Sequence, residues 1–169
     1  MRIAGINEND IADCDDGVCV SLWVQGCPHH CEECHNPETW DFNGGESIDR
    51  EKVLAALTEA INKNGIKRHL SILGGEPLAP QNIDDVIWVA QKVKEKYPDI
   101  KIYLWTGYTI QDLMSRGKED SYYNMLAKCI NILIDGKYDK TKRDVSLRLR
   151  GSKNQHIYES INIGFKFIE

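Results

Sequence analysis

Segments that favour strands and segments that favour helices alternate along this chain. Four short runs rich in aliphatic and aromatic residues predict strands at residues 18–25, 69–73, 101–105 and 130–134. Apolar residues at helical spacing predict helices from Ser47 or Asp49 to Asn64-Gly65, from 81 to 96 and from 121 to 128. Strands joined by crossover helices pair in parallel, so we expect an α/β fold with a mostly parallel sheet.

The length of the chain limits how far such a sheet can extend. Four strand–helix repeats in 169 residues are too few for a closed eight-stranded barrel, which needs about 250 residues. We therefore expect one domain over residues 1–169, built as a partial barrel or an open sheet. Residues 146–150 and 161–167 alternate like strands and predict a short β-like C-terminal segment in which the two pair with each other.

The composition narrows the class of protein. Hydrophobic residues make up 41% and charged residues 28%, and no apolar run approaches the ~20 residues of a membrane span. The N-terminal residues lack the pattern of a secretory signal, and six cysteines without such a signal suit a reducing compartment. The net charge of -5 argues against general nucleic-acid binding. We expect a cytoplasmic protein without a membrane or nucleic-acid partner.

The densest chemical signal is a run of three cysteines. Cys27, Cys31 and Cys34 fall within eight residues, directly after the first predicted strand, where Gly26 and Pro28 end regular pairing. One metal centre can collect thiols at this spacing, and thiolates are the usual ligands of iron-sulfur clusters. A cubane cluster has four irons, so three cysteines leave one iron open for catalysis.

A structural zinc site is the alternative interpretation of the same run. Zinc takes four protein ligands in such sites, and His29, His30 or His35 could complete the set. Zinc sites are usually built from two ligand pairs, and the sequence offers no second pair nearby. We expect His29 and His30 to be surface residues of a turn rather than ligands.

The next predicted strands also end in polar or glycine-rich segments. Gly74-Gly75-Glu76-Pro77 combines two residues that allow close backbone approach with a carboxylate and a fixed turn. Thr106-Gly107-Tyr108 and Asp135-Gly136-Lys137 follow the two later strands. Ligands of open α/β sheets collect at the carboxyl ends of strands, although each segment taken alone could be a plain turn.

Together, the cysteine spacing and the Gly-Gly-Glu-Pro segment resemble the signature of the radical S-adenosylmethionine superfamily. The resemblance implies one 4Fe-4S cluster per chain, bound by Cys27, Cys31 and Cys34, that cleaves S-adenosylmethionine to a 5'-deoxyadenosyl radical. It also implies that Glu76 holds the amino group of the cofactor's methionine. Contacts to S-adenosylmethionine are expected from Glu33, Cys34, His35, Gly74, Gly75, Glu76, Thr106 and Asp135.

The resemblance becomes more specific across residues 16–157. The segments Cys34-His35-Asn36-Pro37-Glu38-Thr39-Trp40 and Arg150-Gly151-Ser152-Lys153-Asn154-Gln155 look like those of activating proteins of anaerobic ribonucleoside-triphosphate reductase. That family implies a glycyl radical made on the large reductase subunit, with an electron donor such as a reduced flavodoxin. An activase of another glycyl-radical enzyme, of the pyruvate formate-lyase type, and a zinc-stabilised non-catalytic interaction module are the alternatives.

One basic stretch remains outside these motifs. Residues 137–153 carry seven lysines and arginines against Asp139 and Asp144. Through Arg148, Arg150 and Lys153 this stretch is a candidate docking surface for the partner, and a solvated loop is the alternative interpretation.

Overall fold

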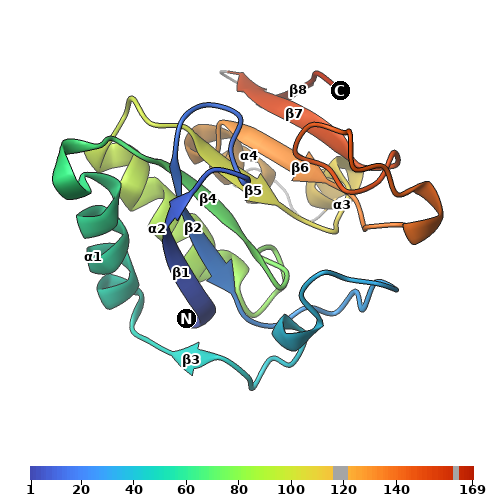
Figure 1. Cartoon of the computed structure of the whole chain (residues 1–169), viewed down its shortest axis with the longest axis horizontal. Coiled ribbons are helices and arrows are strands. Elements are labelled where there is room, and N and C mark those ends of the chain that lie inside the picture. The colour runs from blue at the N-terminus through green and yellow to red at the C-terminus, as the bar shows by residue number, and fades with distance from the viewer. Residues whose placement is uncertain (116–121, 162–163) are drawn as a thin grey trace.

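A single open sheet organises the molecule (Figure 1). The computed structural model describes residues 1–115, 122–161 and 164–169. Within these residues, eight strands follow the order β3-β1-β2-β4-β5-β6-β7-β8. Their bounds are β1 Arg2–Asp10, β2 Cys19–Val24, β3 Glu46–Ser47, β4 His69–Gly74, β5 Ile102–Trp105, β6 Ile132–Asp135, β7 His156–Ile161 and β8 Gly164–Phe167.

The direction of pairing changes from the centre of the sheet to its edges. The central strands β2, β4, β5 and β6 pair in parallel, whereas β3, β1, β7 and β8 pair antiparallel to their neighbours. The expected α/β class and open sheet are confirmed. The expectation of mainly parallel pairing is confirmed for the centre only.

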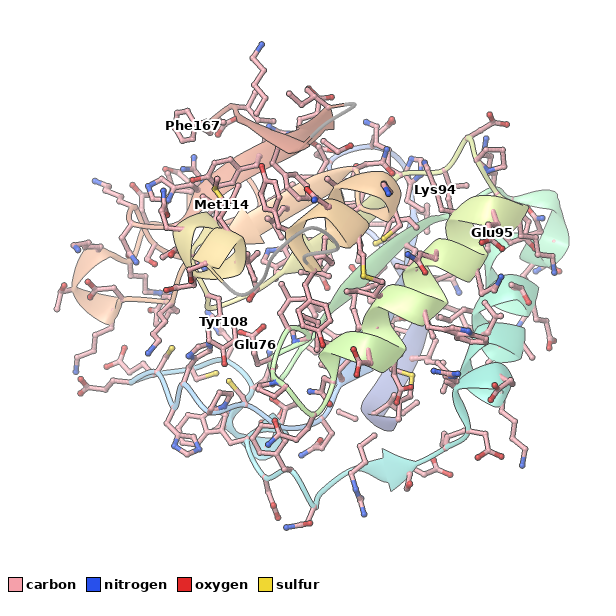
Figure 2. All side chains as sticks on the ribbon, turned by 180° about the vertical axis from the view of Figure 1, so that it is seen from behind. Glu76, Lys94, Glu95, Tyr108, Met114 and Phe167 are labelled. Atoms are coloured by element: carbon pink, nitrogen blue, oxygen red, sulfur yellow. The ribbon has the colours of Figure 1, made fainter. Side chains whose placement is uncertain are left out.

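In the described part of the chain, four α-helices cross over between the strands: α1 Arg50–Ile61, α2 Ile83–Lys96, α3 Ile110–Ser115 and α4 Tyr122–Cys129. Seen from behind, they lie in front of the sheet (Figure 2). The helices α1, α2 and α4 were predicted from apolar spacing, although Ser121 lies outside the described residues. The short helix α3 was not predicted, because its six residues bury only Ile110 and Leu113. No helix in the described ranges is long and apolar enough to cross a membrane.

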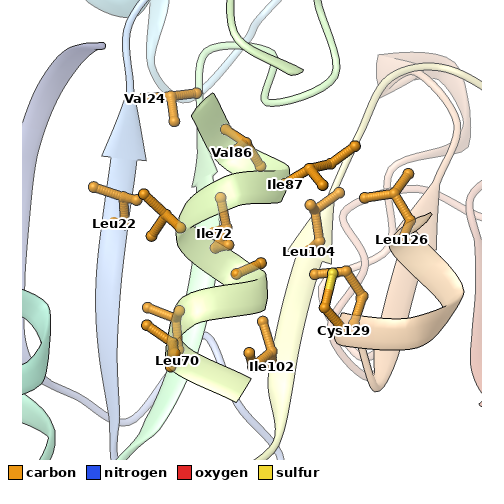
Figure 3. Packing of buried hydrophobic residues seen from close by; sticks show 14 of the residues in the cluster. Leu22, Val24, Leu70, Ile72, Val86, Ile87, Ile102, Leu104, Leu126 and Cys129 are labelled. Atoms are coloured by element: carbon orange, nitrogen blue, oxygen red, sulfur yellow. The ribbon is translucent and has the colours of Figure 1, made fainter. Parts of the chain in front are cut away.

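The main core fills the space between the sheet and the helices. Alternate residues of the central strands, such as Leu22, Ile72 and Leu104, pack there against Val86 and Ile87 of α2 (Figure 3). All five side chains are at most 2% exposed, and burying each contributes roughly 1.5–3 kcal/mol.

The opposite face of the sheet is also covered, which explains why the central strands are apolar on both sides. Cys19, Tyr103, Ile134 and Ile157 form a second cluster there, with Cys14 from the segment before β2. Leu149 from the segment after β6 packs on the same cluster, and its carbonyl accepts a hydrogen bond from Trp105 Nε1 at 2.8 Å.

Two expectations for the chain ends need correction. Residues 146–150 form turns rather than a strand, because Arg148 and Arg150 reach ionic partners instead of pairing along a backbone. The range 161–167 contains the last residue of β7 and all of β8, which pair with each other and not, as expected, with residues 146–150. Asn162 and Ile163 lie outside the described residues. Three strands were not predicted: β3, β7 except for its last residue, and β1, whose Asn, Asp and Gly residues disfavour strands.

Candidate metal centre

The cysteine loop leaves the carboxyl end of β2 and closes on itself. The amides of Gly26 and Cys27 donate to the carbonyls of Thr39 and Trp40 at 2.8 and 3.0 Å. Inside the loop, one residue between each pair of cysteines has a left-handed backbone, with φ of 47° at His30 and 57° at Glu33. These turns coil the chain tightly, as a compact loop with tied ends requires.

A cavity of about 210 Å³ lies between this loop and the carboxyl ends of the parallel strands. It brings together most of the predicted site residues: Cys27, Cys31, Cys34, His35, Gly74, Gly75, Glu76 and Thr106. Glu33 and Asp135 are not part of its described lining. No three His, Cys, Asp or Glu side chains among the described residues converge on a single-ion site.

The surroundings of Cys27 and Cys31 favour the neutral thiols in the absence of a bound group. Burial raises the pKa of Cys27 to about 11, with the charge of Glu76 adding to the effect. Burial, followed by the neighbouring Cys34, also raises the pKa of Cys31. Thiolates in such a place need a compensating cation, and metal binding would release their protons.

One further polar atom at the cavity is without a partner. The indole Nε1 of Trp40 is buried and makes no hydrogen bond in the described part of the chain, and Trp40 lines the cavity. A buried donor left unsatisfied costs about 1–3 kcal/mol. Three thiols and an unused donor around one cavity fit a bound cofactor.

The Gly-Gly-Glu-Pro loop packs backbone to backbone against the start of the cysteine loop. The amides of Gly75 and Glu76 donate to the carbonyls of Val24 and Gly26, each at 2.8 Å. A Cβ atom at position 75 would lie 2.5 Å from the Gly26 oxygen, so a side chain cannot fit there. The glycines therefore allow the Gly-Gly-Glu-Pro loop to approach the backbone of the cysteine loop closely, in addition to lining the cavity.

Glu76 connects three loops at the cavity. Its side chain is 1% exposed. Oε1 accepts hydrogen bonds from Leu78 N at 2.9 Å and Thr106 Oγ1 at 2.7 Å. Oε2 accepts one from Gly107 N at 2.6 Å and lies 2.8 Å from His29 Nε2. The carboxylate is thus engaged by protein donors.

The expectation that His29 is a surface residue is wrong. Its side chain is 6% exposed, and its ring packs edge-on against Tyr108 with the centroids 4.6 Å apart. In Figure 2, Glu76 and Tyr108 lie close together at the end of the sheet that carries the cysteine loop. His30 is exposed, as expected.

The other predicted residues differ in how they relate to the cavity. The Asp135 carboxylate accepts from Ile110 N at 2.7 Å and lies 3.0 Å from His156 Nδ1, behind the cavity wall. The Glu33 side chain is exposed and lies 3.7 Å from Lys140 Nζ. His35 reaches the cavity from the cysteine loop.

The segment after β6 supplies a wall that sequence reasoning did not assign to the site. Tyr138, Gly151 and Gln155 line the cavity. Gln155 fixes this wall, since its Oε1 accepts from Gly151 N at 2.9 Å and its Nε2 donates to Gly136 O at 3.0 Å. The Arg-Gly-Ser-x-Asn-Gln motif contains Gly151 and Gln155 and could have indicated this wall, but the sequence alone gives the motif no structural role.

The basic stretch is largely neutralised within the chain. Arg148 pairs with Asp15 and Glu169, and Arg150 pairs with Glu169. Lys153 lies 3.5 Å from Asp144. These pairs hold the cavity wall to the rest of the molecule. They also reduce the positive charge of the stretch that the sequence suggested as a docking surface for the partner.

Comparison with known proteins agrees with the chemistry of the cavity. Residues 15–158 match the family model of the 4Fe-4S single cluster domain. The anaerobic ribonucleoside-triphosphate reductase-activating protein of Pasteurella multocida is 38% identical over 144 residues, which cover 85% of this chain and 88% of that protein. The proteins of the same name from Escherichia coli K12 and Enterobacteria phage T4 are 34% and 35% identical, covering 84% and 92% of this chain and 88% and 95% of their own. The chain therefore belongs to the family of anaerobic ribonucleoside-triphosphate reductase-activating proteins.

Proposed function

We propose that this protein is a radical S-adenosylmethionine activase of anaerobic ribonucleoside-triphosphate reductase, with one radical S-adenosylmethionine domain over residues 1–169. Cys27, Cys31 and Cys34 would hold a 4Fe-4S cluster, which would supply the electron that splits S-adenosylmethionine into methionine and a 5'-deoxyadenosyl radical. That radical takes a hydrogen atom from a glycine of the large reductase subunit. The observation that carries the proposal is the shared cavity, where three cysteines and the Gly-Gly-Glu-Pro loop meet.

The protein's own residues divide the remaining tasks. Three cysteines leave one iron of a four-iron cluster without a protein ligand, which is the position the cofactor's methionine would take. Gly74, Gly75 and Thr106 line the cavity and can contact S-adenosylmethionine there. Cys34 and His35, together with the backbone of Glu33, are the proposed contacts on the opposite side. Asp135 would affect S-adenosylmethionine binding indirectly, by holding the loop after β5 in place through its hydrogen bond from Ile110 N.

Large side chains around the cavity can keep solvent away from a radical. Trp40, Leu73, Trp105 and Tyr138 all contribute to its lining. Exclusion of water prevents side reactions of reactive intermediates.

The direct test is production of 5'-deoxyadenosine. The protein is reconstituted anaerobically with iron and sulfide, reduced with flavodoxin, and mixed with S-adenosylmethionine and the large reductase subunit. We expect 5'-deoxyadenosine by chromatography and a glycyl radical by electron paramagnetic resonance. Both should disappear in Cys27→Ala, Cys31→Ala and Cys34→Ala.

Cys129→Ser is the matched control, because Cys129 is buried in the main core away from the cavity. It should keep both signals. Cleavage without a radical on the reductase would assign the activase to another glycyl-radical enzyme. Stoichiometric zinc, with no iron uptake and no cleavage, would refute the proposal.

A further inference from the structure

The His29 ring lies where three loops at the cavity meet. It belongs to the cysteine loop after β2, two residues beyond Cys27. Its Nε2 is 2.8 Å from Glu76 Oε2 in the loop after β4. Its ring packs edge-on against Tyr108 in the loop after β5. One side chain therefore connects the cysteine loop to the loops of the two neighbouring parallel strands.

The space around the ring is closely fitted. A Cβ atom on Gly107 would lie 2.3 Å from His29 Cδ2 and 2.6 Å from Nε2, so the ring occupies the room that a side chain at position 107 would need. The same Glu76 oxygen that faces His29 also accepts from Gly107 N at 2.6 Å. The ring is thus fixed on one edge by a hydrogen bond and on its sides by packing.

Burial makes the hydrogen bond difficult to replace with water. The side chains of His29 and Glu76 are 6% and 1% exposed. Removing the donor from such a pair leaves a buried carboxylate one partner short, and hydrogen bonds to charged groups are worth about 1.5–3 kcal/mol. The loops would relax to recover a partner, and Cys27 would move with them.

We propose that His29 is a positioning residue that fixes the cysteine loop, and with it Cys27, relative to the Gly-Gly-Glu-Pro loop. It acts through Glu76 and is not a ligand of the metal. The expected effect of His29 on iron binding requires only that the three cysteines hold a cluster. The expected effect of His29 on S-adenosylmethionine cleavage rests on the proposed function.

The test compares variants that separate the hydrogen bond from the packing. His29→Phe keeps a ring against Tyr108 but has no donor for Glu76, whereas His29→Gln keeps a donor. His29→Asn, whose amide is too short to reach Glu76, serves as a second variant without this hydrogen bond if His29→Phe does not fold. His30→Asn is the matched control, because His30 is the exposed neighbour and asparagine tolerates its φ of 47°.

Two quantities are measured on reconstituted protein: the rate at which a ferrous chelator removes iron, and KM and kcat for S-adenosylmethionine cleavage. We expect His29→Phe to bind as much iron as the wild type, to lose it about tenfold faster, and to raise KM about tenfold with a smaller change in kcat. His29→Gln should remain within about threefold of the wild type. His30→Asn should match the wild type.

Two results would overturn the inference. An unchanged rate of iron loss in His29→Phe, or in His29→Asn where that variant replaces it, would show that the hydrogen bond does not position the loop. A lower iron content per chain in folded His29→Phe would make His29 a ligand instead. If the wild type holds iron but does not cleave S-adenosylmethionine, the proposed function fails while the iron-loss comparison still decides the role of His29.

Discussion

Replacing Glu76 by glutamine exchanges one acceptor oxygen for an amide donor in a side chain that is 1% exposed. If the amide takes the place of Oε1, it faces Leu78 N, and if it takes the place of Oε2, it faces Gly107 N. The hydroxyl of Thr106 and the ring of His29 can each reverse their roles, but a backbone amide cannot. In either orientation, one of these two N–H groups therefore loses its hydrogen bond to the side chain at position 76.

The size of the effect follows from that single loss. A hydrogen bond to a charged acceptor contributes about 1.5–3 kcal/mol, and the burial of Glu76 favours the upper end of this range, so we expect Glu76→Gln to lower the free energy of unfolding by about 3 kcal/mol. With a urea dependence of about 2 kcal/mol per molar, the midpoint should fall by about 1.5 M.

Urea unfolding of the metal-free protein, followed by circular dichroism, measures this shift without any contribution from a cluster. Glu38→Gln is the matched control, since Glu38 is exposed and its backbone carbonyl, which the substitution keeps, accepts the hydrogen bond from Gln25 Nε2. A midpoint for Glu76→Gln within about 0.3 M of the wild type would refute the role of this carboxylate as a structural tie.

Three further predictions concern other parts of the molecule. Burial, and then the charge of Asp10, raise the pKa of Asp13 to about 7, so its contribution to stability is complete below about pH 4 and falls as the pH rises to about 7. In thermal unfolding, Asp13→Asn should be about 1–3 kcal/mol more stable than the wild type near pH 8 and equal to it near pH 4; equal stability at both would contradict this. Arg148→Glu turns two ion pairs, with Asp15 and Glu169, into repulsions, and should cost about 1 kcal/mol at low salt and less in 1 M salt, as urea titrations at both would show. Gly107→Ala should displace the His29 ring and speed iron loss to a chelator as His29→Phe does; a wild-type rate would argue against close packing there.

Much of the fold could be predicted because it depends on local patterns. The helices α1 and α2 and the strands β2 and β4 carry clear apolar periodicity, and short crossovers then fix the parallel order. Strand β1 could not be predicted in this way, since it forms by pairing with β2 rather than by its own preference. The alternation at 146–150 was misleading because loop side chains that reach ion-pair partners can also alternate.

The candidate site was predictable to the extent that it follows from topology. Parallel strands place their carboxyl ends at one edge, so the cysteine loop and the Gly-Gly-Glu-Pro loop had to lie near each other. The burial of His29 was not predictable, because its partner Glu76 is 47 residues away and meets it only after the chain has crossed over. The same holds for Gln155, whose partner Gly136 lies 19 residues earlier.

The carboxylate of Glu76 also has a consequence for motion at this edge of the sheet. It accepts from the amides of Leu78 and Gly107, which belong to loops after different strands. If one of these loops opened alone, the Glu76 carboxylate would lose some of its hydrogen bonds while it remained bonded to the other loop. The two loops should therefore open in one cooperative step. Amide hydrogen exchange at both positions should then proceed at a common rate, and binding a cluster in the cysteine loop would slow exchange in all three loops together.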